Sequence, residues 1–187
     1  MVRVEDLNIT FFHLPKNAGS SIATWLTDNV NGEEYIDDFR HKSPKILKPF
    51  FDDFGWSFCC VRNPWDRTVS WYNFFQKQYK NINKGINIPF EEYMDKLINE
   101  DYTSKYIRPV GHQHATFKYV DYVIKYETLT NDFKKVQEKV KCFKPLNHVN
   151  KSIDADYTQY YTKDSHVNWV GEYYVKDIME LNYSFGG

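Results

Sequence analysis

Residues 57–70, SFCCVRNPWDRTVS, contain the clearest indication of the chain's architecture. The first five of these residues form a short apolar run, which is typical of a strand buried inside a parallel sheet. Asn63 and Pro64 follow as an N-cap and first-turn pair, so we expect a helix to begin directly after the strand. A strand that leads straight into a helix is one step of the alternating order on which our fold prediction depends.

The same alternation extends in both directions from this stretch. Further strands are expected at residues 8–14 and 121–126. Further helices are expected at residues 20–29, 43–54, 64 to about 79, from Pro89 onward, 130–140, and 164–181 with a bend near Gly171. This order predicts an α/β fold in a single domain over residues 1–187, with three layers: a central, mainly parallel sheet flanked by helices.

Composition excludes several classes of protein. The chain has 187 residues, 42% of them hydrophobic and 26% charged, which suits one globular domain. The net charge is −1, so there is no basic excess to hold a nucleic acid. No apolar run approaches the ~20 residues of a membrane span, and residues 1–6 are charged, unlike a secretory signal. We therefore expect a cytoplasmic protein, although a fragment of a longer membrane-anchored chain would have the same composition.

The segment HLPKNAGSS, residues 13–21, is where the first predicted strand ends and a helix begins. Helix N-termini present unpaired N–H groups that suit a phosphate. Gly19 lets the backbone come close, the two following serines add hydroxyl donors, and Lys16 adds a positive charge. In the ATP loop GxxxxGK[ST] the lysine follows the second glycine, whereas here Lys16 precedes Gly19 and is followed by Asn17. The segment predicts a P-loop-like phosphate site without a metal, with an ordinary capped turn as the structural alternative.

A second anion site is predicted at the end of the central strand. Arg62 follows that strand directly, and Ser70 lies about two turns into the next helix. Ligands of open α/β sheets bind along the carboxyl edge of the strands, and the arginine fork suits a phosphate. Two anion sites along one edge predict a ligand with two separated phosphate groups. The alternatives are a salt bridge from Arg62 to Asp66 and a surface hydroxyl at Ser70.

Together, HLPKNAGSS and CCVRNPWDRTVSWY resemble the two signature motifs of PAPS-dependent sulfotransferases, most of all the branch with carbohydrate sulfotransferases and their small bacterial and viral relatives. The resemblance implies that the first loop binds the 5′-phosphosulfate end of 3′-phosphoadenosine 5′-phosphosulfate (PAPS) and that the second motif binds its 3′-phosphate. Weaker similarity covers residues 126–129, 150–152 and 160–185. The implied cofactor-binding residues are Lys16, Asn17, Ala18, Gly19, Ser20, Ser21, Arg62, Ser70, Lys151 and Ser152.

The resemblance implies an enzyme that moves a sulfuryl group from PAPS to an acceptor hydroxyl, on a carbohydrate or a small molecule, and releases 3′-phosphoadenosine 5′-phosphate. Lys16 would stabilise the departing phosphate. His41 lies in an interval where family members often place a functional histidine, so it is the candidate general base, with a solvated loop histidine as the alternative. His112 and His114 have no third ligand in obvious register, and we expect a substrate-facing or surface loop there without a metal.

Three other functions remain compatible with parts of this pattern. A small kinase or other phosphotransferase would need Mg²⁺ ligands and a lysine after the glycine. A non-catalytic nucleotide-binding module would keep the phosphate cradle without a base. A protein-interaction domain would need neither Lys16 nor Arg62 for its partner. The sequence does not identify the acceptor or the oligomeric state.

Overall fold

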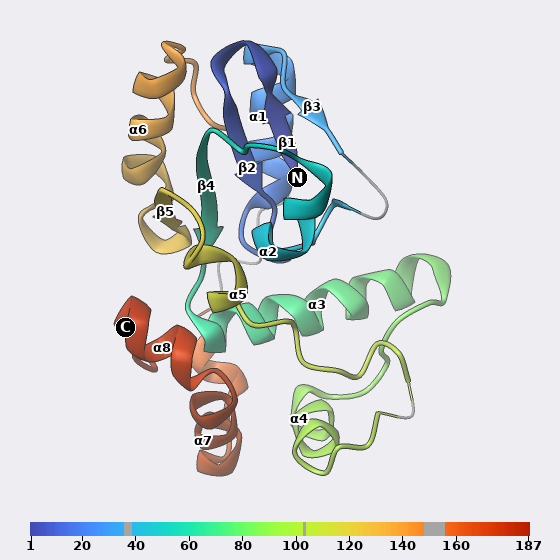
Figure 1. Ribbon diagram of the computed structural model, residues 1–187. Helices are drawn as coiled ribbons and strands as arrows, with labels where there is room; N and C mark the ends of the chain where they lie inside the picture. The colour runs from blue at the N-terminus through green and yellow to red at the C-terminus, as the bar shows by residue number, and fades with distance from the viewer. Residues whose placement is uncertain (36–38, 103, 148–155) are drawn as a thin grey trace. The chain divides into compact units, whose positions relative to one another are not determined.

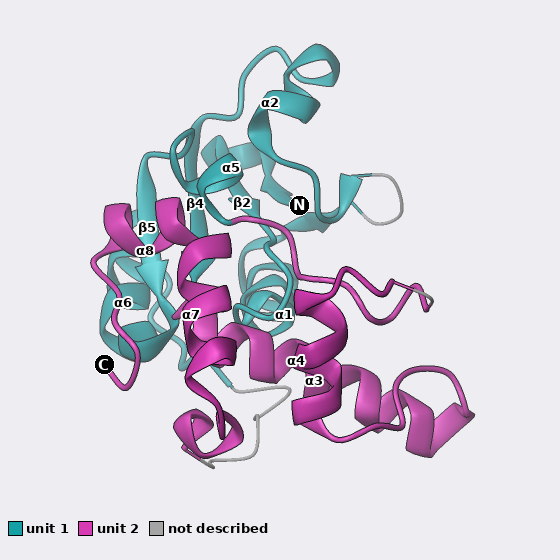
Figure 2. Cartoon of the chain, turned by 90° about the horizontal axis from the view of Figure 1, so that it is seen from below, with its two compact units in different colours: residues 1–62, 113–151 teal, residues 63–112, 152–187 magenta. Residues whose placement is uncertain are grey.

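The computed structural model in Figure 1 describes residues 1–35, 39–102, 104–147 and 156–187. Contacts divide the chain into two compact units, coloured separately in Figure 2. Unit 1 comprises Met1–Arg62 and Gln113–Lys151, and unit 2 comprises Asn63–His112 and Ser152–Gly187. Within the described ranges there are a five-stranded mixed sheet and eight α-helices, so the predicted α/β class is confirmed.

Unit 1 contains the sheet, whose strands lie in the order β3-β1-β2-β4-β5. In chain order they are β1 (Val2–Val4), β2 (Ile9–Phe12), β3 (Glu33–Glu34), β4 (Trp56–Val61) and β5 (Tyr122–Lys125). The three predicted strands, β2, β4 and β5, pair in parallel. Sequence analysis missed β1 and β3, and β1 pairs antiparallel with both β2 and β3. The sheet is therefore mostly but not wholly parallel.

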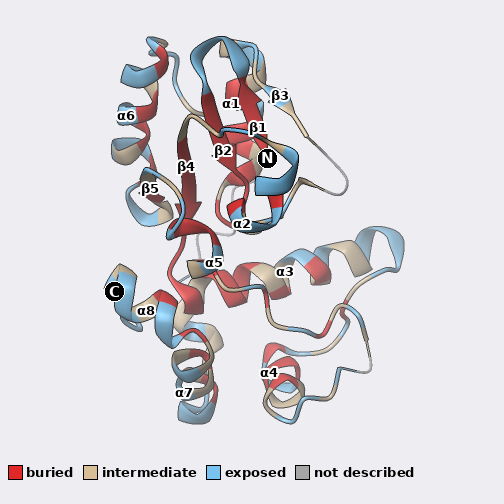
Figure 3. Cartoon of the chain, viewed as in Figure 1, coloured by how far each residue is buried: buried red, intermediate tan, exposed pale blue. Residues whose placement is uncertain are grey.

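Helices cover both faces of this sheet. The helical segments of unit 1 are η1 (Glu5–Leu7), α1 (Gly19–Val30), α2 (Pro44–Leu47), η3 (Lys48–Phe50), α5 (His114–Phe117), η4 (Tyr126–Thr128) and α6 (Leu129–Val140). α1 and α6 pack on one face, where the rings of Trp25 and Phe133 meet edge to face at 4.9 Å. On the other face α5 packs on β4, and Phe12 of β2 meets Phe54 at 5.0 Å. Figure 3 shows β2 and β4 buried between these layers.

The helix expected at residues 43–54 is much shorter than predicted. α2 ends at Leu47 and is followed by one 3₁₀ turn, η3, which contains Pro49. Proline lacks the N–H that a continuing helix needs, and its ring clashes with the preceding turn. The backbone is extended at Phe51, with φ −138° and ψ 124°.

Unit 2 is helical in the ranges that the structure describes. Its elements are α3 (Pro64–Ile82), α4 (Phe90–Ile98), η5 (Tyr157–Tyr160), α7 (Asp164–Tyr173) and α8 (Val175–Leu181). The predicted N-cap is confirmed, because Oδ1 of Asn63 accepts a hydrogen bond from the backbone N–H of Trp65 at 3.1 Å. The closing helix breaks at Tyr174, three residues beyond the expected bend at Gly171. Nowhere in the described chain does a helix have the length and apolar character needed to cross a membrane.

Candidate functional site

The loop between β2 and α1 has an unusual backbone. Lys16 and Ala18 both adopt positive φ angles, 68° and 55°, and Asn17 between them does not. Non-glycine residues rarely adopt this conformation, and those that do cluster at functional sites. Positive φ angles also occur in anion-binding nests, where successive N–H groups turn to one side. The predicted phosphate loop shares this backbone feature at two of its residues.

Gly19, the first residue of α1, is needed for packing. A Cβ atom at this position would lie 1.8 Å from Cδ2 of His13. The His13 ring, only 6% exposed, thus occupies the space that any larger residue at position 19 would require. Burial, aided by nearby His41, lowers the pKa of His13 to about 2, so this ring is neutral at ordinary pH.

His41 lies beside His13. Its Nδ1 is 3.0 Å from the His13 carbonyl oxygen, and the two rings meet edge to face with centroids 4.8 Å apart. Burial lowers the pKa of His41 from 6.5, although the hydrogen bond with the His13 carbonyl raises it. A neutral His41 donates its Nδ1–H to that carbonyl, which leaves the lone pair on Nε2 as the proton acceptor.

Arg62 brings the second predicted anion site next to the first loop. It directly follows β4 and is 4% exposed. Its guanidinium lies over the Tyr126 ring, 4.0 Å from the centroid, and its Nη1 donates a hydrogen bond to the Lys16 carbonyl oxygen at 3.3 Å. The end of β4 and the loop after β2 are therefore neighbours on the same edge of the sheet.

Sequence analysis missed Gln113, which joins these two segments. Its Oε1 accepts hydrogen bonds from Asn17 Nδ2 at 2.7 Å and from the Arg62 backbone N–H at 2.9 Å. Its Nε2 donates to the Arg62 carbonyl at 2.8 Å. Asn17 Nδ2 also donates to the Cys60 carbonyl at 2.8 Å. No sequence motif identifies this glutamine as a functional residue. Its position directly before α5 is the only local feature that could have drawn attention to it.

The remaining predicted residues are distributed as follows. Ser20 and Ser21 lie in the first turn of α1, where Ser21 is buried and lines a cavity of about 240 Å³ together with Trp25 and Asp28. Ser70 belongs to unit 2 and is buried on α3. Residues 151 and 152 lie outside the described part of the chain. Unit 1 thus brings together the Lys16 loop, Arg62 and, through His13, His41.

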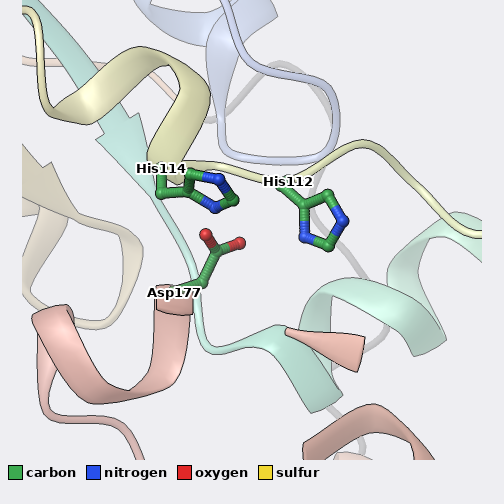
Figure 4. A group of neighbouring side chains, drawn as sticks. All are labelled: His112, His114 and Asp177. Carbon is green, nitrogen blue, oxygen red and sulfur yellow. The ribbon is translucent and has the colours of Figure 1, made fainter. Parts of the chain in front are cut away.

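The HxH pair is divided between the units, since His112 ends a segment of unit 2 and His114 begins α5 in unit 1. Within unit 2 the His112 ring stacks on Tyr173, with centroids 4.7 Å apart. A His112 nitrogen and an oxygen of the buried Asp177 lie within 4.8 Å of one another (Figure 4). Catalytic zinc uses three protein ligands, so these two groups of unit 2 do not by themselves indicate a metal.

Comparison with known proteins agrees with the resemblance in the motifs. The family model described as "Sulfotransferase family" matches residues 1–183. A protein of Archaeoglobus fulgidus, described as an uncharacterized protein, is 28% identical over 116 residues, which cover 60% of this chain and 90% of that protein. The family match includes both motif segments and nearly the whole length of both units. The chain therefore belongs to the sulfotransferase family.

Proposed function

We propose that this sulfotransferase takes its sulfuryl group from PAPS and transfers it to a hydroxyl of a carbohydrate or a small molecule. The main support is the hydrogen bond from Arg62 Nη1 to the Lys16 carbonyl at 3.3 Å. It brings a guanidinium next to a loop that shares a backbone feature with anion-binding nests. Two anion-binding groups on one sheet edge match a ligand that carries two separated phosphates.

The residues of this edge fit the donor chemically. Lys16 supplies an ammonium group, and Gly19 to Ser21 supply the N–H groups and hydroxyls of a helix start. No acidic side chain occurs between residues 15 and 21. In this proposal Lys16, Asn17, Ala18, Gly19, Ser20 and Ser21 hold the 5′ end, and Arg62 and Ser70 hold the 3′-phosphate, with Lys151 and Ser152 as further contacts.

The reaction needs charge stabilisation and a proton acceptor. When bound, PAPS supplies a sulfuryl group whose S–O bond to the 5′-phosphate breaks as the acceptor oxygen attacks from the opposite side. Lys16 and the N–H groups at the start of α1 stabilise the negative charge that develops on that phosphate. His41 takes the proton of the acceptor hydroxyl at Nε2, while its Nδ1–H bond to the His13 carbonyl holds the required tautomer.

Calorimetric titration tests the donor. 3′-Phosphoadenosine 5′-phosphate should bind much more tightly than AMP or ATP, because only the bisphosphate engages both anion groups. Arg62→Ala should weaken its binding by about tenfold or more, the loss expected for a charge-assisted hydrogen bond. Arg108→Ala is the matched control, since it removes the same charge from an exposed position of unit 2.

Three results would contradict the proposal. An unchanged dissociation constant in Arg62→Ala would remove that residue from the site. Mg²⁺-dependent turnover of ATP would indicate a phosphotransferase. Binding of the bisphosphate without transfer to any member of a broad panel of hydroxyl acceptors would indicate a non-catalytic nucleotide-binding module.

A further inference from the structure

Gln113 has a buried side-chain amide that its own helix does not use. The residue is 0% exposed and stands at the N-cap of α5, yet its side chain makes no capping hydrogen bond there. Short polar side chains at an N-cap, those of Ser, Thr, Asp and Asn, commonly bond to the first turn of their helix. Here both ends of the amide serve partners elsewhere in unit 1, so its position has another physical reason.

The amide joins two segments that are far apart in the sequence. It bonds to Asn17, 96 residues away, and to Arg62, 51 residues away. Its two bonds to Arg62 engage the backbone N–H and C=O, the groups through which a neighbouring strand would pair. Gln113 therefore continues the hydrogen bonding of β4 one residue past its end and attaches the Lys16 loop to that residue.

These hydrogen bonds fix the distance between the Lys16 loop and Arg62. Asn17 lies next to Lys16 in the chain, and Arg62 carries the second anion-binding group. A ligand with two phosphates gains affinity only if both groups are held at matching positions before it binds. For reacting groups, a displacement of about 1 Å can lower the rate by about a hundredfold, so small changes in such separations have large effects.

We propose that Gln113 is a positioning residue that sets the distance between the Lys16 loop and Arg62, and thereby selects a doubly phosphorylated nucleotide over a singly phosphorylated one. The inference rests on the proposed function, since it requires that both groups bind the same donor. Gln113 acts through Asn17 and the Arg62 backbone and need not touch the ligand.

The ratio of the dissociation constants of AMP and of 3′-phosphoadenosine 5′-phosphate distinguishes this positioning role from a purely structural one. Loss of a buried hydrogen-bonded side chain lowers stability in either case. A smaller folded fraction weakens the apparent binding of 3′-phosphoadenosine 5′-phosphate and of AMP equally, and leaves the ratio of their dissociation constants unchanged. Loss of the fixed separation weakens only the bisphosphate, which must engage both groups, and so reduces the ratio.

Gln113→Met removes the hydrogen bonds at nearly constant volume. We expect the preference for 3′-phosphoadenosine 5′-phosphate over AMP, measured by calorimetry, to fall by about tenfold or more, the loss of about one charge-assisted hydrogen bond. The control is Gln76→Met in α3, which loses bonds from Nε2 to the Tyr72 hydroxyl and the Ile88 carbonyl. Its preference should equal that of the wild type. An unchanged preference in Gln113→Met would overturn the proposal, whatever the change in melting temperature.

A second variant keeps the test decisive if Gln113→Met does not fold. In its ionised form, which requires measurement at a pH above the pKa of the new carboxyl, Gln113→Glu retains acceptors for Asn17 and for the Arg62 N–H but loses the donor to the Arg62 carbonyl. Its preference should fall by a smaller factor, and combining it with Asn17→Ala should cost less than the sum of the two single effects. The proposal would be overturned if the effects of the two substitutions were fully additive, or if the preference of Gln113→Glu did not fall. A wild-type protein without any preference for the bisphosphate would instead contradict the proposed function.

Discussion

The two units bury polar side chains for different purposes. In unit 1 some buried polar groups lie where strands end and connect loops, as Gln113 connects Asn17 with Arg62. In unit 2 the core consists largely of aromatic rings, and buried hydroxyls such as those of Tyr161 and Tyr174 donate to backbone carbonyls. Substitutions of Lys16, Arg62 or His41 in unit 1 should therefore change ligand binding and turnover, whereas substitutions in the aromatic core of unit 2 should change stability.

The largest effect is expected at the Lys16 loop. Lys16→Ala should lower kcat by about a thousandfold, the upper range for loss of one group that stabilises charge in a transition state, while circular dichroism stays unchanged. Lys105→Ala, an exposed lysine of unit 2 over the Tyr106 ring, is the control with the same loss of charge. If Lys16→Ala kept the wild-type kcat, unit 1 would no longer differ from unit 2 in its effect on turnover.

A smaller effect is expected at His41. His41→Ala should lower kcat by about a hundredfold, the lower range for a general base, with little change in the affinity for 3′-phosphoadenosine 5′-phosphate. Since the pKa of His41 is lowered from 6.5, the wild-type kcat should be constant at neutral pH and fall as acid protonates the ring. In His41→Ala this fall of kcat at acid pH should be absent. A greater loss of affinity than of turnover would point to a different base.

The smallest effect is expected in the core of unit 2. Tyr174 is 2% exposed, and its hydroxyl donates to the Val110 carbonyl at 2.6 Å. Tyr174→Phe should lower the free energy of unfolding by about 1 kcal/mol, measured in urea, because the buried carbonyl loses its donor. Turnover of the folded protein should not change. The exposed Tyr119→Phe serves as control, and a selective loss of kcat in Tyr174→Phe would give unit 2 a catalytic role.

Local signals were enough to predict the centre of the sheet. The apolar run of β4 and the Asn63-Pro64 pair identify the strand end, and Arg62 follows from it. Strands β1 and β3 gave no such signal, because they are three and two residues long and β3 is a pair of glutamates. Their existence depends on pairing with each other and with β2, which periodicity within one segment does not reveal.

The site was predictable only in part, for a similar reason. The positions of the Lys16 loop and Arg62 follow from where strands end, and parallel strands bring those ends to one edge. The role of Gln113 depends on partners 96 and 51 residues away, so no neighbouring residue indicates it. The contact between His13 and Gly19 is also tertiary, and sequence analysis explained Gly19 by ligand approach alone.

The His13 ring against Gly19 also has a consequence for redesign of the loop. The side-chain volumes at positions 13 and 19 constrain each other, because an added methyl group at 19 would occupy the space of the His13 imidazole. Alanine at 19 becomes compatible only with a smaller side chain at 13. That exchange would keep the carbonyl that bonds to His41 but would remove the ring that packs on it, so the loop cannot be redesigned without also affecting His41.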